Sequence, residues 1–220
     1  MKPLQFLLLA ILLPATSFAQ SNFKPGYAVT LKGDTVQGFF DYREWDRSPK
    51  TVKFKTDING ATQLLTPVNT SYFDINGLEA YQRYAGKITL DHINESSVLN
   101  ERDTTFKIDT IFIQVLQRGE KMTLYSYSDN IKTRFYFTEK NDEMPQELGY
   151  RLYYNSEQVT ATKGRTVNEN TYMMQLYNLA QKYNVLNDKL QRMIEDSRYE
   201  KGYILDIVSK INGIGKKKKK

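Results

Sequence analysis

The spacing of apolar residues changes once along the chain, and this change constrains the fold more than any other feature. From Tyr27 to about Tyr154, apolar residues recur at every second position, which is the period of β-strands. After Thr160 they recur every three or four positions, which is the period of amphipathic helices. The sequence therefore predicts an α+β fold, with a mainly antiparallel β body followed by a C-terminal helical segment.

Short turn signals divide the β body into about eight strands. Gly33-Asp34 separates the first two runs, and Asp57 to Gly60, Arg118 to Lys121 and Asp129-Asn130 separate later ones. Connections this short favour antiparallel neighbours, because parallel strands need a long crossover. Residues 68–100 are less regular, and only Lys87 to Asp91 is predicted as a strand there. A meander, a sandwich and a partly closed barrel all fit this spacing.

Three amphipathic helices are predicted after residue 160. Thr166-Val167-Asn168-Glu169 fits a capping box, in which the threonine and glutamate side chains each satisfy a free backbone amide. Gly213 fits the end of the last helix. We expect these apolar stripes to be buried against each other or against the sheet: Tyr172, Met173, Leu176, Tyr177, Ala180 and Tyr183; Leu186, Leu190, Met193 and Ile194; Tyr203, Ile204, Ile207, Val208 and Ile211.

The first 19 residues have the layout of a signal peptide. Lys2 provides a positive charge, Leu4 to Leu13 form an apolar run, and Ser17-Phe18-Ala19 fits a cleavage site after Ala19. The run is too short for a membrane anchor, which needs about 20 apolar residues, and no later stretch predicts a transmembrane helix. No cysteine follows the cleavage site, so the lipoprotein interpretation is excluded. We therefore expect an exported protein that is periplasmic or associated with an outer membrane.

The basic character of the chain is concentrated at its C-terminal end. Without Lys2, the chain has 30 basic and 25 acidic residues, and the run Lys216, Lys217, Lys218, Lys219, Lys220 accounts for the whole excess. Between Gln20 and Val159 there are 17 basic and 19 acidic residues, so no basic folded face is implied. We expect no nucleic-acid partner, because such proteins usually carry a basic stripe on the folded domain. The lysine run itself is either a solvated tail or a contact with an anionic envelope surface.

Composition alone argues against several kinds of catalytic site. A zinc site or a serine triad normally needs histidine, and His92 is the only one. The chain has no cysteine, which excludes thiol chemistry and disulfides. There is no P-loop and no GxGxxG pattern. We expect neither a metal nor a cofactor.

The strongest candidate site residues follow the second predicted strand. Asp41 and Glu44 are the carboxylate pair that would serve a glycosidase, and Trp45 is the only tryptophan. The alternative interpretation is structural, with solvated acids at a turn and Trp45 as part of the core. We favour the structural interpretation, and we keep Trp45, Asp41 and Glu44 as candidate ligand-binding residues.

Residues 26 to 55, GYAVTLKGDTVQGFFDYREWDRSPKTVKFK, resemble the start of a family of exported proteins common in Bacteroidota. The shared pattern is G-Y-x-V-x-x-x-G-D-T-h-x-G-x-h-D-Y-x-x-W-x-x-x-P, where h is apolar. LYSYSDN (124 to 130), RFYF (134 to 137) and ELGYRLYYN (147 to 155) fit the same layout. The resemblance implies no activity for any residue. Many members continue into an outer-membrane β-barrel, and we expect no strands of that kind in the residues after Tyr203.

The sequence thus predicts four segments: a signal peptide (1–19), an antiparallel β-rich domain (20–159), amphipathic helices (160–212) and a basic tail (213–220). The expected role is a non-enzymatic binding or assembly module in the periplasm or at the outer membrane, with other envelope proteins or an anionic envelope surface as partners. Two alternatives stay open. One is a carboxylate-based hydrolase acting on envelope glycans, and the other is the truncated N-terminal part of an outer-membrane β-barrel protein.

Overall fold

The computed structural model describes residues 22–93, 97, 99, 101–142, 144–155 and 166–215. The predicted signal peptide and the lysine run 216–220 lie outside the described residues. The elements within these ranges are β1 (Phe23–Thr30), β2 (Thr35–Asp41), β3 (Val52–Lys55), β4 (Gln63–Leu65), β5 (Thr70–Ile75), β6 (Glu79–Thr89), β7 (Phe106–Arg118), β8 (Met122–Ser128), β9 (Thr133–Glu139), β10 (Gln146–Glu147), β11 (Arg151–Tyr154), β12 (Thr166–Glu169), α2 (Thr171–Lys182), α3 (Asp188–Glu195) and α4 (Lys201–Ile211).

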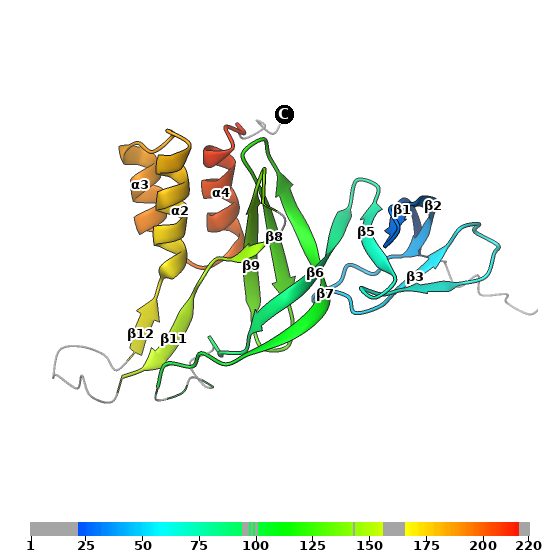
Figure 1. The fold of residues 1–220 in the computed structure, drawn as a ribbon, viewed down its shortest axis with the longest axis horizontal. Helices are drawn as coiled ribbons and strands as arrows, with labels where there is room; N and C mark the ends of the chain where they lie inside the picture. Colours follow the sequence, from blue (N-terminus) through cyan, green and yellow to red (C-terminus); the bar gives the residue numbers. More distant parts are fainter. Residues whose placement is uncertain are drawn as a thin grey trace, which may run out of the picture.

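Ten strands form one open sheet in the order β10-β9-β8-β7-β6-β5-β1-β2-β3-β4 (Figure 1). Every neighbouring pair in it is antiparallel. Strands β5 to β10 form one meander and β1 to β4 another, and the β1–β5 pair joins them. Strands β11 and β12 pair separately. The predicted α+β fold is confirmed, and of the three proposed sheet arrangements the meander is the one observed.

Two glycines bring the first strands close together. Gly26 and Gly38 lie opposite each other in the β1–β2 pair. A Cβ atom on Gly38 would lie 2.3 Å from the Lys55 carbonyl oxygen and 2.4 Å from the Phe54 ring, and one on Gly26 would lie 2.1 Å from the Asp74 carbonyl oxygen. Only glycine leaves room for this approach. The β1–β2 turn also uses glycine, since Gly33 has a φ of 93°, as predicted from Gly33-Asp34.

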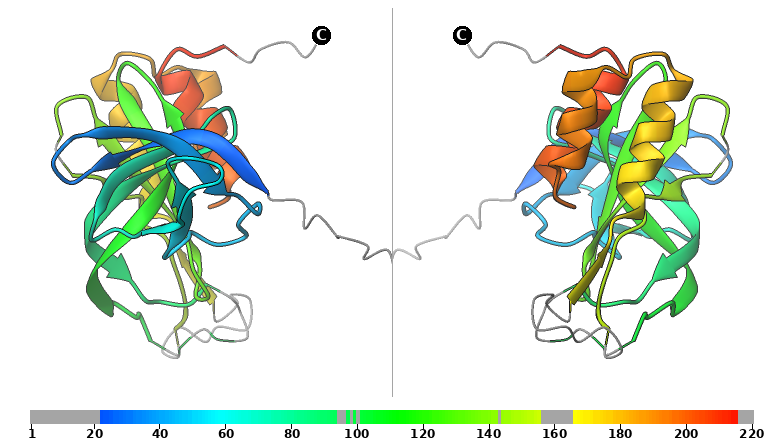
Figure 2. Two further views of the ribbon diagram at one scale, coloured as in Figure 1. Left: turned by 90° about the vertical axis from the view of Figure 1, so that its right-hand side faces the viewer. Right: turned by 90° about the vertical axis from the view of Figure 1, so that its left-hand side faces the viewer.

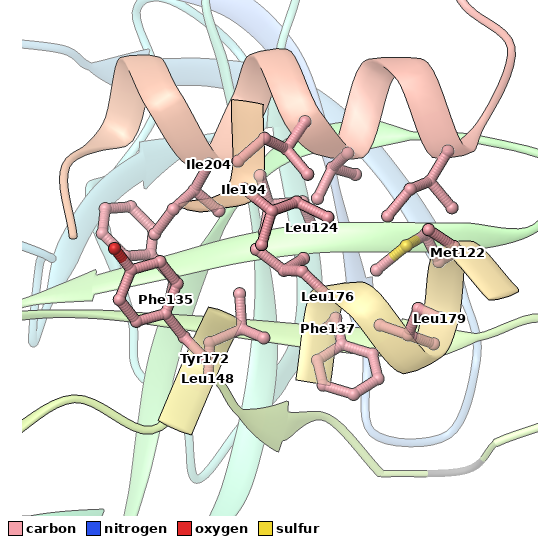
Figure 3. Packing of buried hydrophobic residues seen from close by; sticks show 14 of the residues in the cluster. Met122, Leu124, Phe135, Phe137, Leu148, Tyr172, Leu176, Leu179, Ile194 and Ile204 are labelled. Atoms are coloured by element: carbon pink, nitrogen blue, oxygen red, sulfur yellow. The ribbon is translucent and has the colours of Figure 1, made fainter. Parts of the chain in front are cut away.

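The buried side chains form three clusters. The first lies between the three helices and one face of β8 and β9, as Figure 3 shows, and includes Leu124, Phe135 and Leu176. The second fills the curled β1–β6 half of the sheet with aromatic rings such as Phe40, Phe54 and Phe73. The third lines the opposite face of β8 and β9 with these residues: Tyr84, Ile88, Ile111, Ile113, Tyr125, Tyr127 and Tyr136.

Strand β7 takes part in all three clusters. Phe112 belongs to the second, while its neighbours Ile111 and Ile113 belong to the third. Leu116, near the end of the strand, packs against the first cluster. The thirteen residues of β7 therefore connect the helical half of the molecule to the aromatic half.

The helices gather on one side of the sheet, and α3 lies outside α4 in the right-hand view of Figure 2. The centres of the predicted stripes are buried, including Tyr172 and Leu176 on α2, Leu190 and Ile194 on α3, and Ile204 on α4, whereas Tyr203 is exposed. Gly213, at φ 72°, follows the last helix as predicted. The Gly213 amide donates a hydrogen bond to the Lys210 carbonyl, and the Ile214 amide donates one to the Ser209 carbonyl. This pair of bonds is a Schellman motif.

Two local predictions were wrong. The predicted capping box, Thr166 to Glu169, is strand β12, and α2 begins only at Thr171 after Asn170, whose side chain makes no cap bond. Pairing with β11 satisfies the backbone groups that the cap was expected to satisfy. Residues 68–100 also contain more strand than predicted, because β5 lies there and β6 begins at Glu79, before the predicted start at Lys87. The buried positions of β6 are Tyr81, Tyr84, Ile88 and Thr89, which do not follow a strict period of two.

Within the described ranges, no helix is both long enough and apolar enough to cross a membrane.

Candidate functional site

The three residues proposed from the sequence lie at the end of β2 and in the loop that follows it, and their contacts are those of structural residues. Trp45 is partly buried and packs edge-on against Tyr42 and Tyr81, with ring centroids 5.3 and 5.7 Å apart. Asp41 pairs with exposed Arg43 at 3.1 Å. Glu44 is exposed and adopts a φ of 50°. The structure thus places Trp45 at the edge of the aromatic cluster, and it gives Asp41 a basic partner.

A larger candidate site lies between α3 and α4, and we call it the α3–α4 groove. Its main part has a volume of about 890 Å³. A smaller depression of about 470 Å³ shares Lys189 and Met193 with it and extends the groove toward the α2–α3 loop. The main part is lined by Lys189, Arg192, Met193, Asp196, Glu200, Gly202, Tyr203, Leu205, Asp206 and Ile207.

The groove has an apolar floor and charged rims. Met193 and Leu205 are partly buried and supply apolar surface, Ile207 lies fully buried beneath them, and Tyr203 is exposed at one end. Gly202 is bare, because no atom lies within 4 Å of the place where its Cβ would be. Neither a turn nor a close contact requires glycine at that position. Because Gly202 has no side chain, the backbone of α4 is accessible from the groove there.

Charge varies along the groove. Helices α3 and α4 run in opposite directions along it, so the start of α3 lies beside the end of α4. Lys189 and Lys210 line the depression at that end. Asp196 and Glu200 line the other end, where α3 finishes and α4 begins. The groove therefore has a basic end and an acidic end.

The sheet holds α4 at both of its ends. Before the helix, the Tyr199 hydroxyl donates to the Leu148 carbonyl at 2.7 Å and accepts from the Phe135 amide at 3.0 Å. Burial raises the pKa of the Tyr199 hydroxyl, so it stays neutral. After the helix, Lys121 donates to the Ile211 carbonyl at 2.8 Å, and the side chain of Asn212 accepts from the Met122 amide at 3.1 Å. One wall of the groove is thus fixed to the core of the protein.

The outer wall, α3, is held by packing and by its cap. Asn187 accepts a hydrogen bond from the Leu190 amide at 3.0 Å, which satisfies a free donor in the first turn. Leu190 and Ile194 are buried against the first cluster. The α3–α4 connection is tied down by Tyr172, whose hydroxyl donates to the Ser197 carbonyl at 2.9 Å. The groove is therefore preformed rather than created by binding.

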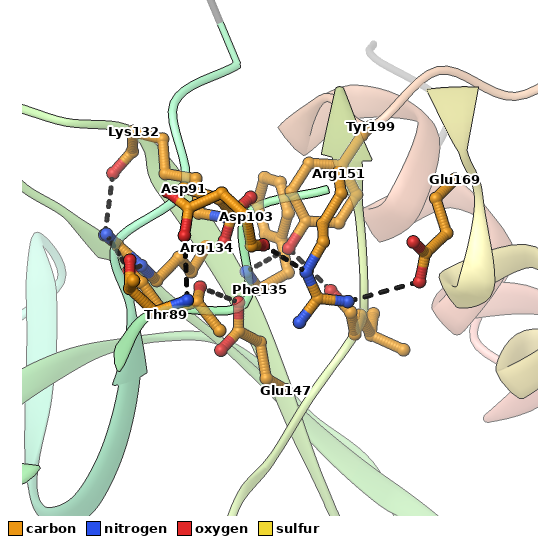
Figure 4. Close-up of polar contacts among 12 residues, drawn as sticks. Thr89, Asp91, Asp103, Lys132, Arg134, Phe135, Glu147, Arg151, Glu169 and Tyr199 are labelled. Carbon is orange, nitrogen blue, oxygen red and sulfur yellow. Dashed lines mark hydrogen bonds and ion pairs between the residues drawn. The ribbon is translucent and has the colours of Figure 1, made fainter. Parts of the chain in front are cut away.

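A second constellation of polar residues lies inside the protein (Figure 4). Lys132 and Asp91 form an ion pair at 2.6 Å with side chains only 1% and 2% exposed. Arg134 is fully buried and donates to the Thr89 carbonyl at 2.8 Å, and it also pairs with Asp129 at 3.1 Å. These contacts tie the end of β6 to the β8–β9 turn and to β9.

The protonation of this cluster is set by burial. Burial lowers the pKa of the Lys132 ammonium, and the hydrogen bond to Asp91 opposes that shift. Burial raises the pKa of the Glu147 carboxyl, which accepts a hydrogen bond from Thr89 at 2.7 Å. One oxygen of Asp91 and the hydroxyl of Tyr136 are buried without a hydrogen-bond partner among the described residues. Because Lys132 and Asp91 are almost inaccessible, we interpret the cluster as an internal brace rather than a reaction centre.

No three His, Cys, Asp or Glu side chains of the described part of the chain come together in a way that could hold a metal ion.

Sequence reasoning found the helices of the groove but missed the groove itself. Met193 and Tyr203 were assigned to the buried stripes, yet Tyr203 is exposed and Met193 only partly buried. Leu205 lies beside the stripe of α4 and widens its apolar surface. That extra width was the available signal, because a helix that only covers a sheet needs no apolar residue beyond its inward face.

Scans against protein-family models, curated proteins and solved structures found no match to this chain.

Proposed function

We propose that the protein is a non-enzymatic assembly module of the cell envelope, and that it docks a protein partner in the α3–α4 groove. The observation that carries this proposal is the preformed apolar groove of about 890 Å³ with charged rims. Helices laid into apolar grooves are a common mode of protein recognition, in which the apolar floor provides affinity and the charged rim provides orientation.

The envelope location rests on the sequence. The arrangement of Lys2, Leu4 to Leu13 and Ala19 supports export, and the resemblance to an exported family supports it independently. Lys216 to Lys220 supply a further contact, since each lysine near an anionic surface contributes about 1 kcal/mol at low screening.

The glycan-hydrolase alternative has less support. A retaining glycosidase needs two carboxylates about 5 Å apart on either side of the bond to be cleaved. Asp41 is instead paired with Arg43, and Glu44 is exposed in the loop after β2. Release of reducing ends from envelope glycans by the wild-type protein, lost in Asp41→Asn or Glu44→Gln, would favour the hydrolase over the docking module.

The docking proposal is tested by photocrosslinking in cells. A photoreactive amino acid replaces Leu205 in the groove, and a matched control replaces Met174, which is 63% exposed on α2 outside it. We expect the Leu205 probe to form a discrete protein adduct that the Met174 probe does not form. Adduct should also be lost when Met193→Glu is added. Equal labelling from both positions would refute the proposal.

A further inference from the structure

The α3–α4 groove is balanced in charge. Three cations line its two parts, Lys189, Arg192 and Lys210. Three anions line it as well, Asp196, Glu200 and Asp206. Arg192 and Asp206 lie toward the middle, so the two ends carry opposite signs. A surface of this kind can complement a second surface that has the same charges in the reverse order.

The groove itself meets that condition. We propose that the α3–α4 groove docks a second copy of this chain around a two-fold axis that crosses the groove at right angles. This inference rests on the proposed docking function and names its partner. The axis places α3 over α3 and α4 over α4 in opposite directions, as in an antiparallel four-helix contact. Lys189 and Lys210 of one copy then face Asp196 and Glu200 of the other, twice in each dimer.

Only one of the two possible two-fold arrangements brings opposite charges together at the ends of the groove, and it also places Arg192 and Asp206 near their own copies in the middle. An axis parallel to the groove would place Lys189 of one copy over Lys210 of the other, and Asp196 over Glu200. Like charges brought together at an interface disfavour association strongly. The charge order therefore fixes the relative orientation of the two copies. The apolar side chains Met193 and Leu205 lie between the charged ends, where the two-fold axis brings each against the partner surface.

Neighbouring charges modify the ends without reversing them. Arg198 lies 4.0 Å from Glu200 in an exposed contact, which is weak in water. Asp188 and Lys201 are exposed next to the basic and acidic ends, but neither lines the groove.

The size of the face predicts a weak dimer. Helices α3 and α4 have 8 and 11 residues, which correspond to lengths of about 12 and 16 Å. Two neighbouring helices of these lengths, with axes about 10 Å apart, present a face whose area is well below the roughly 800 Å² per partner of a stable interface. We expect reversible association that depends on concentration and weakens with salt, because much of the complementarity is electrostatic and exposed.

Charge reversal tests the orientation. Lys189→Glu with Lys210→Glu makes both ends acidic, and Asp196→Lys with Glu200→Lys makes both ends basic. Sedimentation equilibrium of the purified mature chain should show self-association, weakened about tenfold or more in each double variant. An equimolar mixture of the two variants should associate again, because the acidic ends of one variant then face the basic ends of the other.

The control changes net charge equally at a distance from the groove. Lys53→Glu with Lys140→Glu alters two exposed lysines on other elements and should leave association unchanged. Thermal unfolding confirms that each variant is folded. A wild-type chain that stays monomeric, or a mixture that fails to associate, overturns the two-fold proposal. If the Leu205 probe still forms its discrete adduct with another protein, the docking function survives that failure; if no adduct forms, both proposals fail.

Discussion

Removing one partner of the buried Asp91–Lys132 pair should destabilise the protein far more than removing one partner of a surface pair. Lys132→Met leaves the Asp91 carboxylate buried, with neither oxygen hydrogen-bonded to a side chain of the brace. Breaking a buried ion pair in this way costs about 3–5 kcal/mol. In a chain of this length, each kcal/mol corresponds to about 2–4 °C, so the melting temperature should fall by about 6–20 °C.

The double variant Asp91→Leu with Lys132→Met separates the interaction between the two charges from the contacts that each side chain makes with its surroundings. Asp91→Leu alone leaves the Lys132 ammonium buried and should be as harmful as Lys132→Met. Combining the two removes both charges, and replacement of a buried pair by apolar side chains is often nearly neutral. We therefore expect the double variant to be more stable than either single variant, with a coupling free energy of about 3 kcal/mol or more.

Urea unfolding of the four proteins at neutral pH measures this cycle. Arg43→Met serves as the control, because it removes a cation from the exposed Asp41–Arg43 pair, where the side chain of Arg43 is 69% exposed. Exposed pairs contribute about 0–1 kcal/mol. If Lys132→Met costs no more than Arg43→Met, or if the losses from the two buried variants simply add, the buried brace does not stabilise the fold as argued.

Three further predictions concern other parts of the chain. Gly38→Ala should lower the unfolding free energy by about 1–3 kcal/mol, because the new Cβ would meet the Lys55 carbonyl. Gly202→Ala should raise it by up to about 1 kcal/mol, because nothing lies near its Cβ position. Equal effects of the two substitutions in urea unfolding would contradict the packing described. Since burial raises the folded-state pKa of Glu147 above its ordinary 4.5, the folded state binds more protons and stability should fall as pH rises from that value. Glu147→Gln should lack that fall, and parallel stability–pH profiles for the two proteins would refute the assignment. Deleting Lys216 to Lys220 should leave folding unchanged but abolish salt-sensitive binding to anionic vesicles; equal co-sedimentation at low salt would show that the run is not an anchor.

The parts of the fold that follow from short-range patterns could be predicted from the sequence. The turn at Gly33 is an example, because its signal lies within a few residues and needs glycine for its positive φ. Gly213 is another, since a helix that ends in a Schellman motif favours glycine at this position. The β12 strand was mistaken for a cap because Thr166 to Glu169 matches both possibilities locally, and only pairing with distant β11 decides between them.

The buried brace could not be predicted in the same way. Asp91 and Lys132 are 41 positions apart, and each looks like a solvated residue at the end of a strand. Arg134 stands in RFYF, where alternation suggests that it points to solvent, but both faces of β9 are covered. The groove was missed for a related reason, since its lining depends on how α3 and α4 lie relative to each other.

Strand β7 also sets where this chain can tolerate insertions and deletions. Its side chains alternate between clusters, so adding or removing one residue before Phe112 would exchange the places of Phe112 and its isoleucine neighbours. Phe112 would then enter the third cluster, where isoleucine packs, and an isoleucine would enter the second cluster, where Phe112 packs. Length variation among natural variants should therefore avoid the middle of β7 and collect in its flanking turns, such as the one at Gly119, and in other connections between strands.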